Sequence, residues 1–139
     1  MKVLRPSFPA GLLALISLFV LLGWVSDAGA YRSITSSENS VIVNVKPVEL
    51  APGQPAKFEV GMNTHSVNLL QDMVAVSTLT DDHGRTYQPV KWQGSGPGGH
   101  HRRGVLEFPA LEESVKSVKL VIKDVSDVPQ RMFEWKIEN

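Results

Sequence analysis

The sequence contains no cysteine, so it forms no disulfide bond and has no cysteine to carry a lipid anchor. It also lacks an excess of charge of either sign, because 14 Lys and Arg residues balance 14 Asp and Glu residues. Domains that bind nucleic acid broadly usually carry a basic excess, so we expect no nucleic-acid partner. A G-x-S-x-G nucleophile motif and a regular calcium loop are also missing. These absences favour a small domain that is not an enzyme.

Long apolar runs are confined to the first thirty residues. Lys2 and Arg5 give a positive start, residues 11–25 carry no charge, and Ala28-Gly29-Ala30 supplies the small residues that signal peptidase accepts. The pattern predicts a signal peptide over residues 1–30, cleavage after Ala30, and a periplasmic or secreted protein. After cleavage, 12 basic and 13 acidic residues remain.

The alternative to cleavage is an N-terminal membrane anchor. The apolar run of residues 11–25 is shorter than the roughly 20 residues that a helix needs to cross a bilayer. Counting the uncharged flanks, from residue 6 to residue 26, brings the span close to that length. In either case we expect contact with a membrane only through this N-terminal segment.

The rest of the chain divides into a short polar start and one domain. Residues 31–40 are Ser-rich and show no period, which predicts a flexible tether. From residue 41 to residue 139 the pattern changes to short segments of alternating apolar and polar residues, separated by Gly, Pro, Asn and Asp. This alternation is typical of strands that bury one face. We predict seven strands, over residues 41–46, 56–62, 74–80, 86–92, 104–108, 117–124 and 131–137.

Seven amphipathic strands in about 100 residues predict an all-β fold. Each sheet must bury its apolar face against another, so we expect an antiparallel β-sandwich of immunoglobulin-like type. A small closed barrel is the alternative. Residues 81–85 (DDHGR) predict a hairpin turn, because Gly84 accepts the positive φ that a tight turn requires. Residues 93–103 form a long Gly-rich loop, and a long loop in a compact domain is often functional.

Two segments carry most of the side chains that are suited to a site. The first is Asn63-Thr64-His65-Ser66, and the second runs from Gly98 to Arg103 and contains His100 and His101. Imidazole is a common ligand of zinc and copper, and a protein without thiols would use nitrogen and oxygen donors. One hypothesis is therefore a Zn or Cu site formed by His65, His100 and His101.

The same segments also suit a negatively charged ligand. Arginine offers a bidentate fork to carboxylate or phosphate, and Gly-rich backbone can present several N–H groups to an anion. In this hypothesis the ligand is a small anion or a protein partner. It is held by residues of both segments: Asn63, Thr64, Ser66, Gly98, Gly99, Arg102 and Arg103.

The segments also carry a resemblance. The pattern Asn63-Thr64-His65-Ser66-Val67, followed by residues 81–92 (DDHGRTYQPVKW) and Gly98-Gly99-His100-His101, resembles an uncharacterised family of exported or membrane-anchored bacterial and archaeal domains. The resemblance covers roughly residues 58–135 and implies an extracytoplasmic location and a joint role for the two His-bearing segments. The family pattern favours Asp at the position of Asn63, which would weaken a metal site here.

Together these observations predict an exported, non-catalytic binding domain. Its recognition surface is expected where the His65 segment meets the loop from Gly98 to Arg103. A Zn- or Cu-binding protein is one alternative, and a structural or protein-interaction module without a small ligand is another.

Overall fold

The computed structural model describes residues 2–3 and 31–138. The predicted signal peptide lies outside these residues apart from positions 2 and 3, so its existence and its cleavage stay predictions. Within the described residues, no helix combines the length and the apolar character that crossing a membrane requires.

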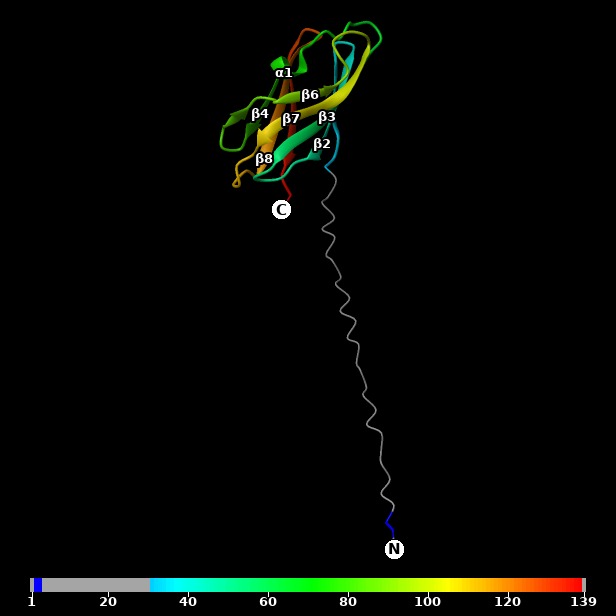
Figure 1. Ribbon diagram of the computed structural model, residues 1–139. Helices are drawn as coiled ribbons and strands as arrows, with labels where there is room; N and C mark the ends of the chain where they lie inside the picture. Colours follow the sequence, from blue (N-terminus) through cyan, green and yellow to red (C-terminus); the bar gives the residue numbers. More distant parts are fainter. Residues whose placement is uncertain (1, 4–30, 139) are drawn as a thin grey trace.

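Residues 31–138 form nine strands and one short helix (Figure 1). The helix α1 spans Met73–Val76. The strands are β1 (Ile34–Glu38), β2 (Val41–Glu49), β3 (Pro55–Thr64), β4 (Ser77–Asp81), β5 (Thr86–Tyr87), β6 (Lys91–Gly94), β7 (His101–Ala110), β8 (Ser117–Val125) and β9 (Val128–Lys136).

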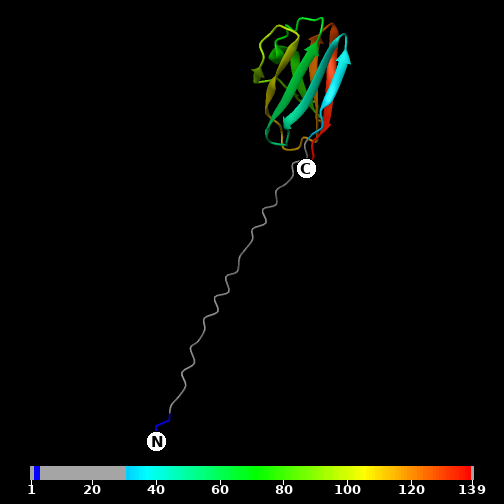
Figure 2. The same cartoon turned by 90° about the vertical axis from the view of Figure 1, so that its right-hand side faces the viewer.

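The strands form two antiparallel sheets that pack face to face. Sheet A has the order β1-β2-β3-β7-β6, and sheet B has the order β5-β4-β8-β9. Figure 2 shows β3, β2 and β1 of sheet A with β9 of sheet B beside β1 at the edge of the sandwich. The predicted antiparallel β-sandwich is therefore confirmed.

The core lies between the sheets and is built by the alternation read from the sequence. Val41, Val43 and Val45 of β2 are buried, and so are the inward residues of β3, β8 and β9. Phe58 of sheet A lies 5.8 Å from Phe108 in an edge-to-face arrangement and 5.4 Å from Trp135 of sheet B, measured between ring centroids. Each such side chain contributes about 1.5–3 kcal/mol by leaving water, so these contacts hold the sheets together.

The tether predicted for residues 31–40 is wrong for Ile34–Glu38, which form β1. This strand pairs with β2 from Ile34 opposite Val45 to Glu38 opposite Val41. Polar residues can form this strand because the hydrogen bonds between strands use backbone groups. Ser36 also has a polar partner inside the domain, because its hydroxyl accepts a hydrogen bond from Arg131 Nη1 at 3.0 Å.

Two further strand predictions need correction. Residues 74–80 contain α1 before β4, because the side chain of Asp72 caps the helix by accepting hydrogen bonds from Val74 N and Ala75 N. Residues 86–92 are divided between the sheets: β5 pairs with β4, and β6 pairs with β7. Pro89 between them has no N–H group to continue a ladder, which favours the change of sheet at this point.

Arg131 is a buried charged residue that joins the two sheets. Its side chain is 1 % exposed and donates hydrogen bonds to the carbonyl oxygens of Ser36, Glu38, Val41 and Val125. Burial lowers the pKa of its guanidinium and Glu38 opposes this, but arginine remains charged because its ordinary pKa is so high. The carbonyl oxygens thus replace water around a buried cation.

The turns β1–β2 and β8–β9 meet at one end of the sandwich, which we call the distal end. Asn39 and Ser40 have positive φ, as do Ser126 and Asp127, which is typical of two-residue hairpin turns. Asn39 Nδ2 donates to Ser126 O at 3.0 Å, and Ser126 Oγ donates to Asn39 O at 2.7 Å.

The two ends of the described domain lie together at the other end of the sandwich. Tyr31 OH donates a hydrogen bond to Leu50 O at 3.0 Å and accepts one from Glu138 N at 3.3 Å. The antiparallel register places the end of β3 and the start of β7, and with them the two candidate segments, at the distal end.

Candidate functional site

The structure brings the two candidate segments side by side. Asn63, near the end of β3, lies opposite His101 at the start of β7. Just beyond the ladder, Thr64 N donates to His100 O at 3.0 Å, and Leu69 N donates to Gly99 O at 3.0 Å. The prediction that the His65 segment adjoins the glycine loop is confirmed.

Much of this contact is made by two loops, residues 65–72 and 95–100, which we call the loop pair. The loop predicted for residues 93–103 is shorter at both ends, because residues 93–94 belong to β6 and residues 101–103 to β7. Thr64 is buried, and its hydroxyl oxygen accepts hydrogen bonds from Ser66 N and Val67 N, which fixes the turn after β3. Gly98 N donates to Leu69 O at 2.7 Å and so binds the second loop to the first. The hydroxyl of Thr64 is therefore used within the fold.

The predicted N–H cradle at Gly98 and Gly99 is not available to an anion. Both residues have positive φ, 116° and 78°, which other residues rarely adopt. Their N–H groups point into the loop pair, where Gly98 N donates to Leu69 O and Gly99 N donates to the side chain of Asn68. These glycines shape the loop.

Arg102 does not face solvent, contrary to the expectation that it grips an anion. Its side chain is 3 % exposed, and it donates hydrogen bonds to the carbonyl oxygens of Leu69, Gln71 and Ser95. Its guanidinium carbon also lies 5.8 Å from the centroid of the Trp92 ring, a cation–π contact. Burial lowers the pKa of Arg102, opposed by Asp72. This guanidinium fastens the loop pair to β6 and β7.

The three histidines of the metal hypothesis do not form a cluster. Residues 2–3 and 31–138 contain no group of three His, Asp or Glu side chains placed to hold an ion. His65 and His100 are exposed in the loop pair, whereas His101 lies on the outer face of sheet A with its Nδ1 2.9 Å from Asn63 Oδ1. The arrangement of these histidines therefore gives no support to a metal site.

A hollow opens beside His101 on the outer face of sheet A. Asn44, Gly61 and Arg103 lie in one row across β2, β3 and β7, and Gly61 has no side chain to fill the middle of that row. A Cβ built at Gly61 meets no atom within 4 Å. We call this depression the Gly61 hollow. It has a volume of about 510 Å³ and is lined by Asn44, Glu59, Gly61, Asn63, Ser95, His101, Arg102 and Arg103.

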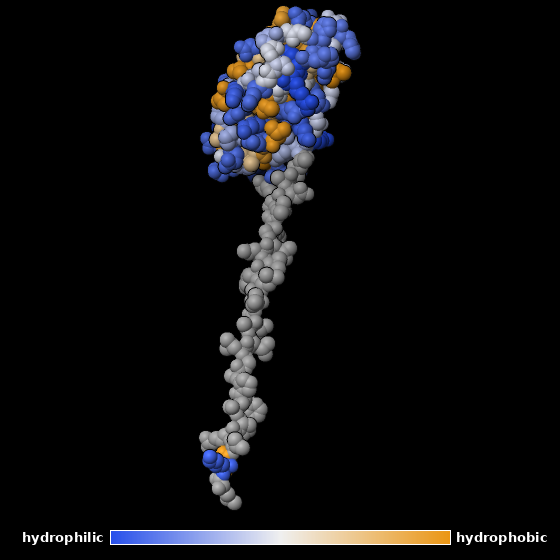
Figure 3. Space-filling view, turned by 45° about the vertical axis from the view of Figure 1, so that its right-hand side comes forward, coloured by the Kyte–Doolittle hydropathy of each residue, from blue (hydrophilic) through white to orange (hydrophobic). Residues whose placement is uncertain are grey.

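The surroundings of the hollow are polar. Figure 3 shows hydrophilic residues over much of this side of the molecule, with apolar residues scattered between them. A glycine inside a strand costs stability and often marks a place where a ligand or another backbone approaches closely. The combination of an unfilled strand position and a polar rim makes the Gly61 hollow our candidate site.

The polar side chains around the hollow are held by one another. Arg103 Nε donates to Glu59 Oε1 at 3.1 Å, and Arg103 Nη2 also binds this oxygen. Asn44 Nδ2 donates to Thr35 Oγ1 at 2.7 Å on the neighbouring strand. These contacts favour one arrangement of the rim, and a rim arranged in advance loses less entropy on binding.

Of the residues that line the hollow, the sequence predicted Asn63, His101, Arg102 and Arg103 as site residues and missed Asn44, Glu59, Gly61 and Ser95. The alternation in β3 placed Glu59 and Gly61 on the outer face, so this part of the signal was present. What was missing was the register that aligns Gly61 with Asn44 and Arg103 across three strands. Ser66 and His65 are exposed but do not line the hollow.

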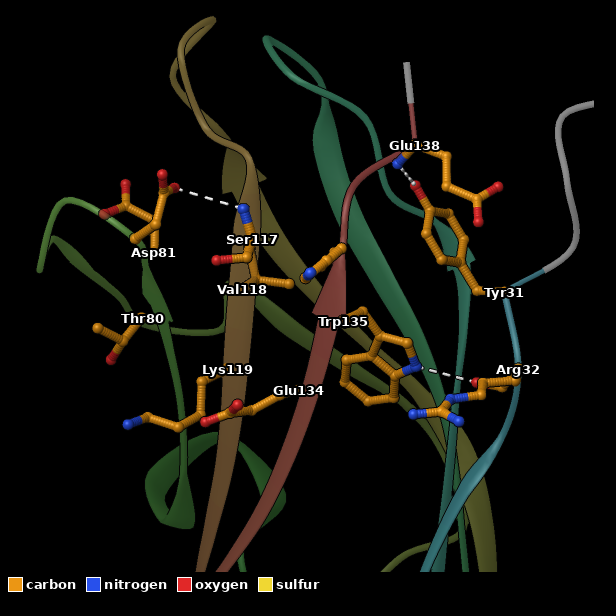
Figure 4. Close-up of a pocket in the computed structure, with 12 residues that line it drawn as sticks. Tyr31, Arg32, Thr80, Asp81, Ser117, Val118, Lys119, Glu134, Trp135 and Glu138 are labelled. Atoms are coloured by element: carbon orange, nitrogen blue, oxygen red, sulfur yellow. Dashed lines mark hydrogen bonds between the residues drawn. The ribbon is translucent and has the colours of Figure 1, made fainter.

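A second, larger depression of about 740 Å³ lies at the opposite end, where Tyr31 meets β8 and β9 (Figure 4). Several of its polar groups already bind other parts of the domain. Trp135 Nε1 donates to Arg32 O at 2.9 Å, and Asp82 Oδ1 accepts from Lys116 N and Ser117 N. The hydrogen bond from Lys116 N has the largest effect on the pKa of Asp82 and lowers it. The bond from Ser117 N lowers it further, whereas partial burial acts in the opposite direction.

Asp81 lies beside this depression and is also committed to the fold. Its Oδ1 accepts from His83 N and Arg85 N, and its Oδ2 accepts from Arg85 Nε at 2.8 Å and Tyr87 OH at 2.9 Å. Burial favours the neutral acid, but these hydrogen bonds outweigh burial and hold the pKa of Asp81 below its usual range. This carboxylate organises the β4–β5 hairpin.

Comparison with known proteins identifies no relative: no family model, curated protein or solved structure matches the chain.

Proposed function

We propose that this protein is an exported, non-catalytic binding domain whose recognition surface is the Gly61 hollow. The observation that carries the proposal is the unfilled position at Gly61 inside a strand, surrounded by polar side chains of β2, β3 and β7. The cost of a glycine at this position has a reason if a ligand occupies the space that a side chain would fill.

The chemistry of the lining residues supports binding without catalysis. Ser95 is the hydroxyl-bearing residue among them, and its Oγ donates to Arg103 O at 3.2 Å. A nucleophilic serine needs a base that takes its proton, and here the proton is directed to a carbonyl oxygen. His101 is paired with Asn63, an amide that neither gives nor takes a proton at neutral pH.

Export rests on the sequence of the first thirty residues. The positive start, apolar run and Ala28-Gly29-Ala30 support transport out of the cytoplasm. Intact-mass measurement of protein recovered after export tests this part, with Tyr31 as the expected first residue. A chain recovered from the membrane with residue 1 or 2 still present would replace cleavage by anchoring.

Binding at the hollow is tested by heteronuclear NMR on the ¹⁵N-labelled protein purified after export. A panel of neutral saccharides, amino acids, acetate, inorganic phosphate and Zn²⁺ is added one at a time. We expect at least one compound to move the amide signals of Gly61, Asn63 and Arg103 while leaving those of β8 unchanged. If none of them moves these signals, the Gly61 hollow is not the binding surface.

A further inference from the structure

The Gly61 hollow offers both free acceptors and free donors. Among residues 2–3 and 31–138, no hydrogen-bond partner is present for Glu59 Oε2 or His101 Nε2, nor for Arg103 Nη1 or Asn63 Nδ2. Asn63 Oδ1 can only accept, so this hydrogen bond requires the tautomer of His101 with its proton on Nδ1, in which Nε2 is an acceptor. Two acceptors and two donors thus surround the same space.

The two exposed charges that line the hollow are of opposite sign. Glu59 and Arg103 form an ion pair there, and the remaining lining side chains are uncharged apart from the buried Arg102, which the carbonyl oxygens of the loop pair enclose. An anion that approaches Arg103 is repelled by Glu59, and a cation that approaches Glu59 is repelled by Arg103. A charged ligand would also have to compete with the existing ion pair, so the charge pattern favours a neutral ligand.

A neutral ligand that fits these atoms needs groups that both donate and accept hydrogen bonds. The hydroxyl group has this property, and neighbouring hydroxyls on a ring can contact several atoms of the rim at once. The missing side chain at Gly61 leaves its Cα hydrogens exposed to the hollow, a small apolar surface on which the carbon face of a sugar ring can pack.

Resting on the proposed function, we infer that the ligand of the Gly61 hollow is a neutral saccharide. Its ring lies over Gly61, with hydroxyl groups donating to Glu59 Oε2 and His101 Nε2 and accepting from Arg103 Nη1 and Asn63 Nδ2. The carbohydrate is either a free sugar or part of a cell-surface polymer, since both present the same hydroxyl groups.

The decisive variant is Gly61→Val. Because a Cβ at this position meets no atom within 4 Å and its φ is not positive, the variant is expected to fold while filling the hollow. Gly96→Ala is the matched control, since Gly96 also has free space around it but does not line the hollow. Folding of both is checked by circular dichroism and thermal melting.

Binding is measured by NMR titration with glucose, galactose, mannose, N-acetylglucosamine and their common disaccharides. We expect one or more to bind the wild type and Gly96→Ala equally and to bind Gly61→Val at least tenfold more weakly. The affinity should change less than twofold between 0 and 0.5 M NaCl, because a neutral ligand has no net charge for salt to screen. Polysaccharide fragments of the cell surface, tested in the same way, distinguish a polymer from a free sugar.

The outcomes separate the inference from the proposed function. If no saccharide binds but an amino acid, acetate or phosphate moves the amide signals of Gly61 and Arg103, the ligand class is wrong and the recognition surface stands. Saccharide binding that Gly61→Val leaves unchanged overturns the inference by placing the sugar elsewhere. If none of these compounds affects the hollow, both the inference and the proposed function fall.

Discussion

Arg102 and Arg103 are neighbours in β7 and both border the Gly61 hollow, yet their side chains point to opposite faces of sheet A and make different contacts. Arg102 points inward and donates its hydrogen bonds to carbonyl oxygens of the loop pair, whereas the side chain of Arg103 is 77 % exposed at the Gly61 hollow. Alternation along a strand is enough to separate them. The segment from Gly98 to Arg103 therefore has two roles. Its backbone and its inward side chain stabilise the loop pair, and its outward side chains form part of the rim of the Gly61 hollow.

The comparison also explains why burial, rather than residue type, decides the role of an arginine here. A buried guanidinium exchanges water for protein acceptors, here backbone carbonyl oxygens, and therefore holds the surrounding segments together. An exposed guanidinium paired with a carboxylate contributes little to stability, so it is free to serve recognition. Substitutions at buried and at exposed positions test this division.

Replacing Arg131 with Met is expected to have the largest effect on stability. The change leaves the carbonyl oxygens of Ser36, Glu38, Val41 and Val125 without their buried donor, and each such loss costs about 1–3 kcal/mol before relaxation. We expect the free energy of unfolding, measured by urea denaturation, to fall by about 4 kcal/mol. A fall below about 1 kcal/mol would show that the carbonyl contacts are dispensable.

Replacing Arg102 with Met is expected to lower the free energy of unfolding by about 3 kcal/mol, because three carbonyl oxygens of the loop pair lose their donor. Arg103→Met is the matched control, with an expected change below about 0.5 kcal/mol. Urea denaturation measures both. Equal losses in the two variants would contradict the division between an inward structural arginine and an outward one.

Asp81→Asn tests a buried carboxylate at the end of the sandwich opposite the hollow. We expect the free energy of unfolding to fall by about 2 kcal/mol at pH 7, because the ion pair with Arg85 and hydrogen bonds to the charged form are lost. Ligand binding at the hollow should not change. An altered affinity would mean that the two regions are coupled.

The same variant gives a pH dependence. The folded pKa of Asp81 lies below its ordinary value of 3.8, so its stabilising effect is present above pH 3.8 and is lost as the pH falls through the folded pKa. Thermal melts should therefore show a constant gap between wild type and Asp81→Asn from pH 7 to about pH 5 and a narrowing gap below pH 3.8. A difference in melting temperature that grows as the pH falls would contradict a lowered pKa of Asp81.

Gly61→Ala should have a small effect on stability and the opposite sign. The alanine methyl group meets no atom, and loss of glycine's freedom in the unfolded chain should raise the free energy of unfolding by about 0.5 kcal/mol. Differential scanning calorimetry against Gly96→Ala checks this. A clear loss of stability at Gly61 alone would indicate a structural need for glycine and remove the main support for a ligand site.

The inner and outer faces of the central strands could be predicted from the sequence. In β2, β3, β8 and β9 apolar and polar residues alternate, so that one set faces the core and the other faces solvent. The boundaries failed where tertiary contacts decide. Ser36 reads as polar loop until Arg131 is known to lie beneath it, and Pro89 lies within an apolar segment that the structure divides between two sheets. Local pattern carries no information about partners 95 positions away along the chain.

The candidate site, like the fold, could be predicted from the sequence only in part. The spacing of the residues could not predict that the His65 segment adjoins the glycine loop, and only the resemblance implied it; the pairing of Asn63 with His101 shows that the two segments are adjacent. The Gly61 hollow could not be predicted, because a glycine leaves a hollow only if its neighbours in β2 and β7 do not fill the space, and the sequence does not show which residues these neighbours are. Arg102 was misjudged because its partners are backbone carbonyl oxygens, which any sequence supplies.

The most direct test is a search for intermolecular nuclear Overhauser effects between a bound saccharide and the Hα protons of Gly61. If the hollow is where the ligand lies, ring protons of the sugar should show contacts to these protons and to side-chain protons of Asn63 and His101. Contacts confined to the exposed His65 and His100 of the loop pair, with none to Gly61, would contradict the account.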